Sequence, residues 1–342
     1  MKKIKTILPV VAVILVFIAL FSLISALLSP KYATDLVEGG MISQYYREEK
    51  NHDVIFLGDC EVYANFSPLE MYRETGITAY VRGTSQQLLW QSYSILEETF
   101  TYEIPKAVVF NVNAMRYGEP VKEEFHRLTI DKMRWSKQKV DIILSSMTEE
   151  ETFLSYVFPI LRYHARFDKL TNEDFTYLFK DKDNTHNGHL INQNVKPVGK
   201  LPAKRKLPNY DFADICYEYL EKITALCKEK GVELILIKAP SLYPYWYEQY
   251  DAQIADFAEK HSLSYYDLTK HIEDIGLDFQ TDTYDAGLHL NLAGAQKLSR
   301  YFAKILTENH GIADRRNDPE ISALYAQKLT VYDEAIKDRK ES

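Results

Sequence analysis

Two groups of residues in this 342-residue chain have types and spacing that could perform nucleophilic chemistry. Cys60 follows the apolar run 54–57 and Gly58, and a thiol in such a turn is a candidate nucleophile. His289 follows Asp282 and Asp285, either of which could orient the imidazole as a general base. The simpler interpretation is a buried cysteine and an unrelated polar turn, because free cysteine usually behaves as a small hydrophobe.

An alternation of apolar runs and helical stretches must position these residues. Strands are predicted at 54–57, 77–81, 107–110, 232–237 and 264–267, separated by helices that include 68–74, 85–104, 212–230, 251–261 and 292–308. Such alternation predicts an α/β fold with a parallel sheet. Ser67, Ser85 and Asn291 are predicted helix caps. In an open α/β sheet the residues that follow the strands lie at the ligand-binding edge, so Cys60 is expected there.

The alternation lapses between about 115 and 208, which predicts an insertion. It contains His186 and His189, but no further ligand stands at metal-binding spacing, so we expect a loop there and no metal site. The loop after the fourth strand contains Tyr243, Tyr245 and Trp246, which we expect to wall the same cleft as Cys60 and to bind substrate.

The N-terminus predicts a membrane anchor. Residues 7–28 are uncharged and apolar, and as a helix they would span about 33 Å, enough to cross a bilayer. Lys2, Lys3 and Lys5 precede them, which places the N-terminus in the cytoplasm and the rest of the chain outside it. A cleavable signal peptide is the alternative, although its apolar region is usually shorter. The predicted organisation is an anchor over 1–29, a stalk over 30–51, a domain over 52–311 and a charged tail over 312–342.

The overall composition argues against several other functions. A net charge of −8 gives no electrostatic basis for binding nucleic acid. Three cysteines are too few for a disulfide framework, and we expect Cys216 and Cys227 to lie in the core. No sequence pattern calls for a cofactor.

Taken together, these motifs resemble the four sequence blocks of the SGNH/GDSL hydrolases. The matching residues are Gly58-Asp59-Cys60 with Ser67-Pro68, then Gly83, Asn113, and Asp285 with His289. The resemblance implies a three-layer flavodoxin-like sheet, attack by Cys60, an oxyanion hole from the Cys60 and Gly83 backbone N–H groups and the Asn113 side chain, and His289 as base. With its anchor the chain is most similar to membrane-tethered, extracytoplasmic members such as the D-alanyl transfer protein DltD. These act on cell-envelope glycopolymers beside a membrane-bound O-acyltransferase.

The chain departs from that family pattern at three places. Cysteine stands where the family has serine, Ala286 stands where the family has its acid, and Asn111 replaces a glycine. A thiol near a protonated histidine tolerates a displaced acid, whereas Asp59 and Glu61 would raise its pKa if they point inward. These features predict a Cys-His acyltransferase or esterase with Asp285 supporting His289. The alternative is an inactive accessory protein that binds glycan or the acyltransferase partner.

Overall fold

Five parallel strands form a single sheet at the centre of the molecule. The structure is a computed structural model that describes residues 2–30, 40–120, 122–178 and 186–341. Its strands are β1 (Val54–Gly58), β2 (Ala79–Gly83), β3 (Ala107–Asn111), β4 (Glu233–Lys238) and β5 (Ser264–Asp267). The strand order β2-β1-β3-β4-β5 is that of flavodoxin-like folds, which confirms the predicted fold class.

Helices connect the strands and flank them. They are α1 (Lys2–Leu28), α2 (Met41–Tyr45), α3 (Cys60–Asn65), α4 (Pro68–Thr75), α5 (Leu89–Tyr102), α6 (Glu123–Ile130), α7 (Lys137–Ser146), α8 (Phe153–Val157), α9 (Ile160–Tyr163), α10 (Asn172–Thr176), α11 (Asp214–Lys230), α12 (Glu248–His261), α13 (Ile272–Ile275), α14 (Leu292–His310) and α15 (Pro319–Glu341). Short 3-10 turns are η2 (Val112–Arg116), η3 (His164–Asp168) and η4 (Leu268–His271).

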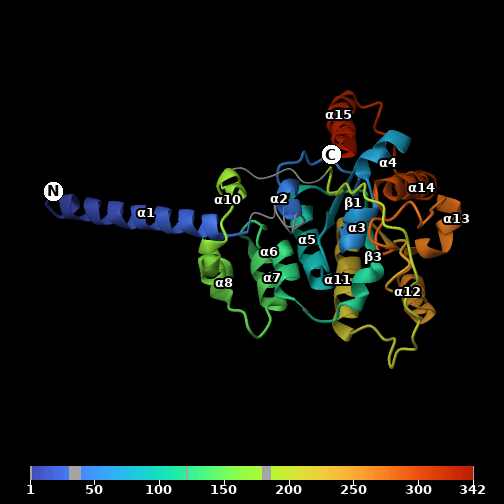
Figure 1. Ribbon diagram of the computed structural model, residues 1–342, viewed down its shortest axis with the longest axis horizontal. Coiled ribbons are helices and arrows are strands. Elements are labelled where there is room, and N and C mark those ends of the chain that lie inside the picture. Colours follow the sequence, from blue (N-terminus) through green and yellow to red (C-terminus); the bar gives the residue numbers. More distant parts are fainter. Residues whose placement is uncertain (1, 31–39, 121, 179–185, 342) are drawn as a thin grey trace.

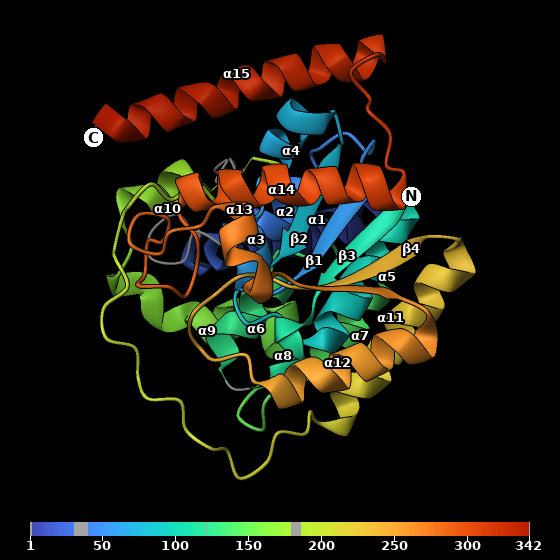
Figure 2. The same ribbon diagram turned by 90° about the vertical axis from the view of Figure 1, so that its right-hand side faces the viewer.

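The sheet is buried on both faces, giving three layers (Figures 1 and 2). Successive strand residues point to opposite sides. Ile55 and Leu57 therefore pack with residues of α5, α7, α11 and α12, and Val54 and Phe56 pack with residues of α3, α4 and α14. This two-sided burial explains why the central strands are continuous apolar runs rather than alternating ones.

The second strand begins two residues later than predicted. Val54 of β1 pairs with Ala79 in the parallel ladder, so β2 starts at Ala79. Thr78 lies just before it and its carbonyl accepts hydrogen bonds from the Asp53 and Val54 N–H groups. Ile77 is fully buried in the core, which accounts for its apolar character without placing it in the strand.

Two of the three predicted helix caps differ from expectation. Asn291 caps α14 by accepting a hydrogen bond from the Gly294 N–H at 3.2 Å, as predicted. Ser67 precedes α4, but its hydroxyl donates to the Tyr332 hydroxyl instead of accepting a helix N–H. Ser85 does not cap α5, which begins four residues later at Leu89, and its hydroxyl contacts the Tyr63 hydroxyl.

The segment around His186 covers the β2 edge of the sheet. Asn187 accepts a hydrogen bond from the Val81 N–H at 3.0 Å and donates its side chain to the Ala79 carbonyl. Helix α15 then packs outside this edge, and its Tyr325 and Tyr332 are fully buried. The C-terminal segment is therefore docked on the domain and shields an edge strand that would otherwise be open to pairing.

Candidate active site

A sharp turn between β1 and α3 holds the candidate nucleophile. Asp59 caps the helix by accepting a hydrogen bond from the Glu61 N–H, and Cys60 is the first helical residue. Gly83 lies directly against this turn, because a side chain there would come within 2.9 Å of the Asp59 carbonyl and 2.3 Å of the Val62 side chain. Only glycine fits, so the close approach of β2 to the turn accounts for Gly83.

Asp285 holds the candidate base. Its Oδ2 lies 2.6 Å from His289 Nδ1, and its Oδ1 accepts a hydrogen bond from the His289 backbone N–H at 2.7 Å. The Tyr284 ring stacks parallel to the imidazole with a centroid separation of 5.6 Å. Asp282, the other carboxylate considered, is bound to Lys297 at 2.7 Å and does not contact the imidazole.

The loop between Asp285 and His289 has a left-handed backbone. Ala286 has φ +65° and Gly287 has φ +96°, values that fold the chain back on itself. This turn brings the carboxylate to the imidazole from four residues away, one more than in the family pattern. A side chain at Gly287 would also press on Leu242, whose N–H donates to the Gly287 carbonyl at 2.7 Å.

The Cys60 thiol and the His289 ring lie next to each other and shift each other's pKa. Burial and the Asp59 carboxylate raise the pKa of Cys60, and the neighbouring His289 only partly offsets this. Burial acts to lower the pKa of His289, but interactions with Cys60 and Asp285 outweigh it and raise the pKa well above 6.5. His289 Nε2 is buried and makes no hydrogen bond of regular geometry among the described residues. The ring is thus held at Nδ1, with its other nitrogen left for the thiol.

Asn113 lies beside the same turn but is already engaged. Its side-chain N–H donates to Asp59 Oδ2 at 2.6 Å, and the Tyr117 hydroxyl donates to the same oxygen at 3.1 Å. Burial and the neighbouring Glu61 raise the pKa of Asp59, whereas Asn113 and Lys238 lower it. The second amide N–H of Asn113 is held only loosely, with the Tyr117 oxygen 3.5 Å away. That N–H remains the one that a developing oxyanion could recruit.

A buried ion pair joins α3 to the end of β4. Lys238 Nζ lies 2.8 and 2.9 Å from the two carboxylate oxygens of Glu61, and both side chains are buried. Asn111 donates to the same carboxylate at 2.9 Å and accepts from the Ala239 N–H at 3.0 Å. The residue that departs from the family glycine therefore ties the Glu61 carboxylate to the end of β4. Sequence reasoning missed Lys238, whose only signal is a charge directly after the apolar run 234–237.

The aromatic residues after β4 pack on other aromatic rings. Trp246 packs on Phe212 and Tyr250 at the edge of the core, with ring centroids 6.0 and 5.4 Å apart. Tyr243 packs on Tyr245, whose hydroxyl donates to the Pro202 carbonyl. These contacts join Trp246 to the edge of the core, and they join Tyr243 and Tyr245 to each other and to Pro202 in the segment before α11. Their role in binding substrate stays a prediction.

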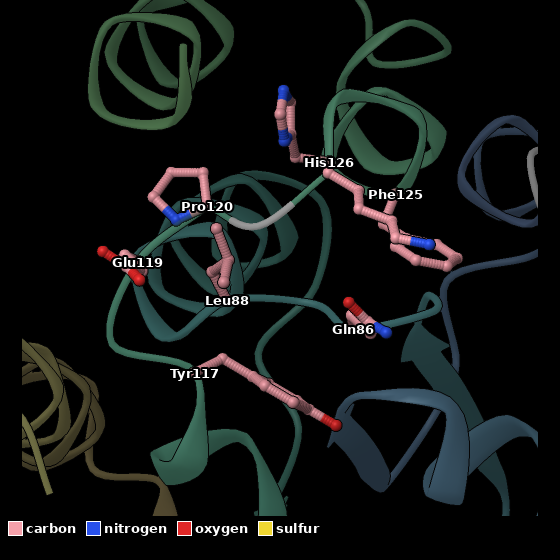
Figure 3. Close-up of a pocket in the computed structure, with 8 residues that line it drawn as sticks. Gln86, Leu88, Tyr117, Glu119, Pro120, Phe125 and His126 are labelled. Carbon is pink, nitrogen blue, oxygen red and sulfur yellow. The ribbon is translucent and has the colours of Figure 1, made fainter. Parts of the chain in front are cut away.

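A pocket is connected to the candidate site through Tyr117 (Figure 3). It is lined by Gln86, Leu88, Tyr117, Glu119, Pro120, Lys122, Phe125 and His126. Tyr117 is the link to the candidate site, since its ring lines the pocket and its hydroxyl reaches Asp59. The lining residues follow β2 and β3, and the positions after those strands are the sequence signal that could have indicated them.

Comparison with known proteins gives similarity at the level of structure. No family model matches the chain, and no curated protein matches it. A predicted acylhydrolase from Bacteroides fragilis has 12% sequence identity and a TM-score of 0.38, over 78% of this chain and 94% of that one. A GDSL-like lipase from Bacteroides thetaiotaomicron has 11% identity and a TM-score of 0.35, over 79% of this chain and 99% of that one. At these identities and TM-scores, the chemistry must be argued from the chain's own residues.

Proposed function

We propose that the chain is an acyl-ester hydrolase or acyltransferase that works through Cys60, His289 and Asp285. One observation carries the proposal: His289 is held at Nδ1 by Asp285 at 2.6 Å while its buried Nε2 is left for the Cys60 thiol. A nucleophile, a base and a group that orients the base are the parts that covalent acyl transfer requires.

The proposed reaction starts from a neutral Cys60 thiol, whose pKa is raised by burial and Asp59, beside the fraction of His289 that is neutral. His289 takes the thiol proton as sulfur attacks the acyl carbonyl carbon. The C–O bond to the alcohol then breaks, the imidazolium returns the proton to the leaving alkoxide, and an acyl-thioester remains on Cys60. Water or an acceptor hydroxyl attacks the thioester with His289 again as base, which releases the thiol. Asp285 stabilises the imidazolium formed in each half-reaction.

The oxyanion of both half-reactions would lie near the start of α3. The Cys60 and Gly83 backbone N–H groups and the loosely held N–H of Asn113 are the proposed donors. The pocket behind Tyr117 would accept the acyl group, since Leu88, Pro120 and Phe125 give it apolar walls.

The location that we propose is the outer face of a cell membrane. Helix α1 contains one stretch, Pro9–Leu28, that is long and apolar enough to cross a bilayer, a property that a signal sequence would share. With Lys2, Lys3 and Lys5 inside, a cell-envelope glycopolymer would be the acyl donor or acceptor, and a membrane-bound O-acyltransferase a partner. A reporter fused after Ser342 should be active only outside the cytoplasm. Activity of that fusion in the cytoplasm would contradict this location.

An acyl adduct tests the chemistry directly. The detergent-solubilised chain is incubated with p-nitrophenyl acetate, quenched in acid and digested for mass spectrometry. We expect an acetyl group on the Cys60 peptide, absent from Cys60→Ala and from His289→Ala, with Cys216 and Cys227 unmodified. If the three thiols are acetylated to the same low extent, Cys60 is not an acyl-transfer nucleophile.

The second candidate function is binding without catalysis. The hydrogen bond from Asn113 to Asp59 favours it, because it commits an oxyanion donor to a carboxylate, and the raised thiol pKa favours it as well. In that case the same site would bind glycan or a membrane acyltransferase. Binding that persists in the Cys60→Ala variant, with no turnover by the native chain, would select this function.

A further inference from the structure

The outer end of α1 packs along the domain instead of standing clear of it. Phe21, Ser25 and Leu28 recur at helical spacing, and the last two are buried. The Phe21 ring lies 5.8 Å from the Phe158 ring in an edge-on arrangement. Arg166 donates to the Leu28 carbonyl at 2.7 Å, which satisfies an unpaired group at the helix end.

This packing determines how far the domain extends along α1 from its outer end, Leu28. Phe21 lies seven residues before Leu28, so the contact with Phe158 is about 10 Å below the outer end of the helix. The part of the apolar run below that contact, residues 7–20, would span only about 21 Å, whereas a hydrocarbon core is about 30 Å thick. If α1 crosses the bilayer, the residues beside Phe21 must therefore enter it.

The residues beside Phe21 are suited to that environment. Helices α8, α9 and α10, with η3, lie around the base of α1 where it leaves the body of the molecule (Figure 1). Large apolar side chains on this segment are exposed: Leu154 by 57%, Phe158 by 41%, Leu161 by 53%, Phe167 by 72% and Phe175 by 58%. Exposed apolar side chains gathered beside a membrane helix are typical of surfaces that enter the interface of a bilayer.

We propose that residues 153–176, the membrane-facing segment, insert their exposed apolar side chains into the outer leaflet, with lipid acyl chains as the occupant. The inference rests on the membrane-anchoring part of the proposed function. According to this inference, the domain lies on the bilayer surface in one orientation. It is not held away from the membrane by a flexible linker.

The net charge of the membrane-facing segment determines whether its insertion requires anionic lipid. Arg162, Arg166 and Lys169 are balanced by Asp168, Glu173 and Asp174. Arg162 pairs with Glu123, and Arg166 pairs with Asp174, so these guanidinium groups are already neutralised. Insertion should therefore occur in phosphatidylcholine, a zwitterionic lipid with no net charge, without any anionic lipid.

Site-specific photocrosslinking tests the proposal in the full chain. The photoreactive residue p-benzoylphenylalanine replaces Phe167 in one variant and Phe175 in another, and the protein is reconstituted in phosphatidylcholine nanodiscs. We expect covalent lipid adducts at both positions by mass spectrometry. Val331 is the matched control, since it is 57% exposed and belongs to α15, a helix that lies apart from α1 in Figure 1. No lipid adduct is expected there.

A fourth position separates this inference from the anchoring on which it rests. Phe17 is 68% exposed on α1 and should crosslink to lipid if that helix spans the bilayer. Adducts at position 17 but at neither 167 nor 175 would overturn the membrane-facing segment and leave the anchor intact. No adduct at position 17 would contradict the anchor itself. In native membranes, crosslinks from position 167 to a protein and not to lipid would make the segment a partner-docking surface and also overturn the proposal.

Discussion

Asp285 Oδ2 lies 2.6 Å from His289 Nδ1, and the same carboxylate accepts the His289 backbone N–H. Two hydrogen bonds from one residue fix both the position of the imidazole and its tautomer. The separation of four residues is bridged because Ala286 and Gly287 adopt positive φ angles. The acid that seemed displaced in the sequence therefore reaches its histidine in the fold.

Replacing Asp285 by asparagine should lower acyl-ester turnover by about 10²-fold, because an amide favours the wrong tautomer and does not stabilise an imidazolium. Turnover of p-nitrophenyl esters is the measurement, with thermal unfolding to show that the fold persists. Asp274→Asn is the matched control, since Asp274 binds His271 at 2.8 Å in an exposed pair outside the site. Equal turnover in the two variants would remove Asp285 from the proposed mechanism.

Thiol alkylation should report the raised pKa of Cys60. Because the thiolate is the reactive form and the pKa lies above its ordinary value, the iodoacetamide rate should rise about tenfold per pH unit from pH 6 to 8. Cys60 should still react faster than Cys216 and Cys227, because its side chain is partly exposed whereas both of those thiols are buried. His289→Ala removes a group that lowers the thiol pKa and should slow the reaction. A plateau below pH 7 would instead indicate a preformed thiolate.

Asn113→Ala should reduce ester turnover by about 10²-fold if its loosely held N–H serves the oxyanion. Iodoacetamide labelling of Cys60 involves no carbonyl oxyanion, so that rate should change far less. Comparison of the two rates separates oxyanion stabilisation from damage to the nucleophile. Asn309→Ala, an exposed change away from the site, is the control. Equal losses in turnover and labelling would mean that Asn113 acts only by holding Asp59.

The Glu61–Lys238 pair should matter for stability in proportion to its burial. Lys238→Met leaves a buried carboxylate without its cation and should cost about 3–5 kcal/mol, whereas the double change with Glu61→Gln should recover much of that loss. Lys222→Met removes an exposed pair with Glu218 of comparable length, 2.6 Å, and should cost about 0.5 kcal/mol or less. Urea denaturation measures all three variants. A cost for Lys238→Met as small as that for Lys222→Met would show that the buried pair does not anchor α3.

Local patterns in the sequence were enough to predict the strands and the kind of sheet. An apolar run such as 54–57 has to be buried on both faces, and helical stretches between such runs leave only a parallel arrangement. The position of Cys60 at the ligand-binding edge follows from the same rule, because it comes directly after a strand. The length of the uncharged apolar run 7–28 also predicted α1. The cap of α14 at Asn291 could be predicted because it depends only on the first turn of that helix.

Tertiary structure determined the orientation and the hydrogen-bond partners of each side chain at the site. Whether Asp282 or Asp285 supports His289 depends on two backbone angles in a loop, and sequence spacing does not fix them. Asn113, Asp59 and Tyr117 meet only because β1 and β3 are neighbours, so their hydrogen bonds and the resulting pKa shifts could not be predicted from the chain. Ser67 and Trp246 show the same limit, because distant partners in α15 and before α11 determine where each side chain points. Such contacts join residues far apart in sequence, and only the packed fold brings them within reach.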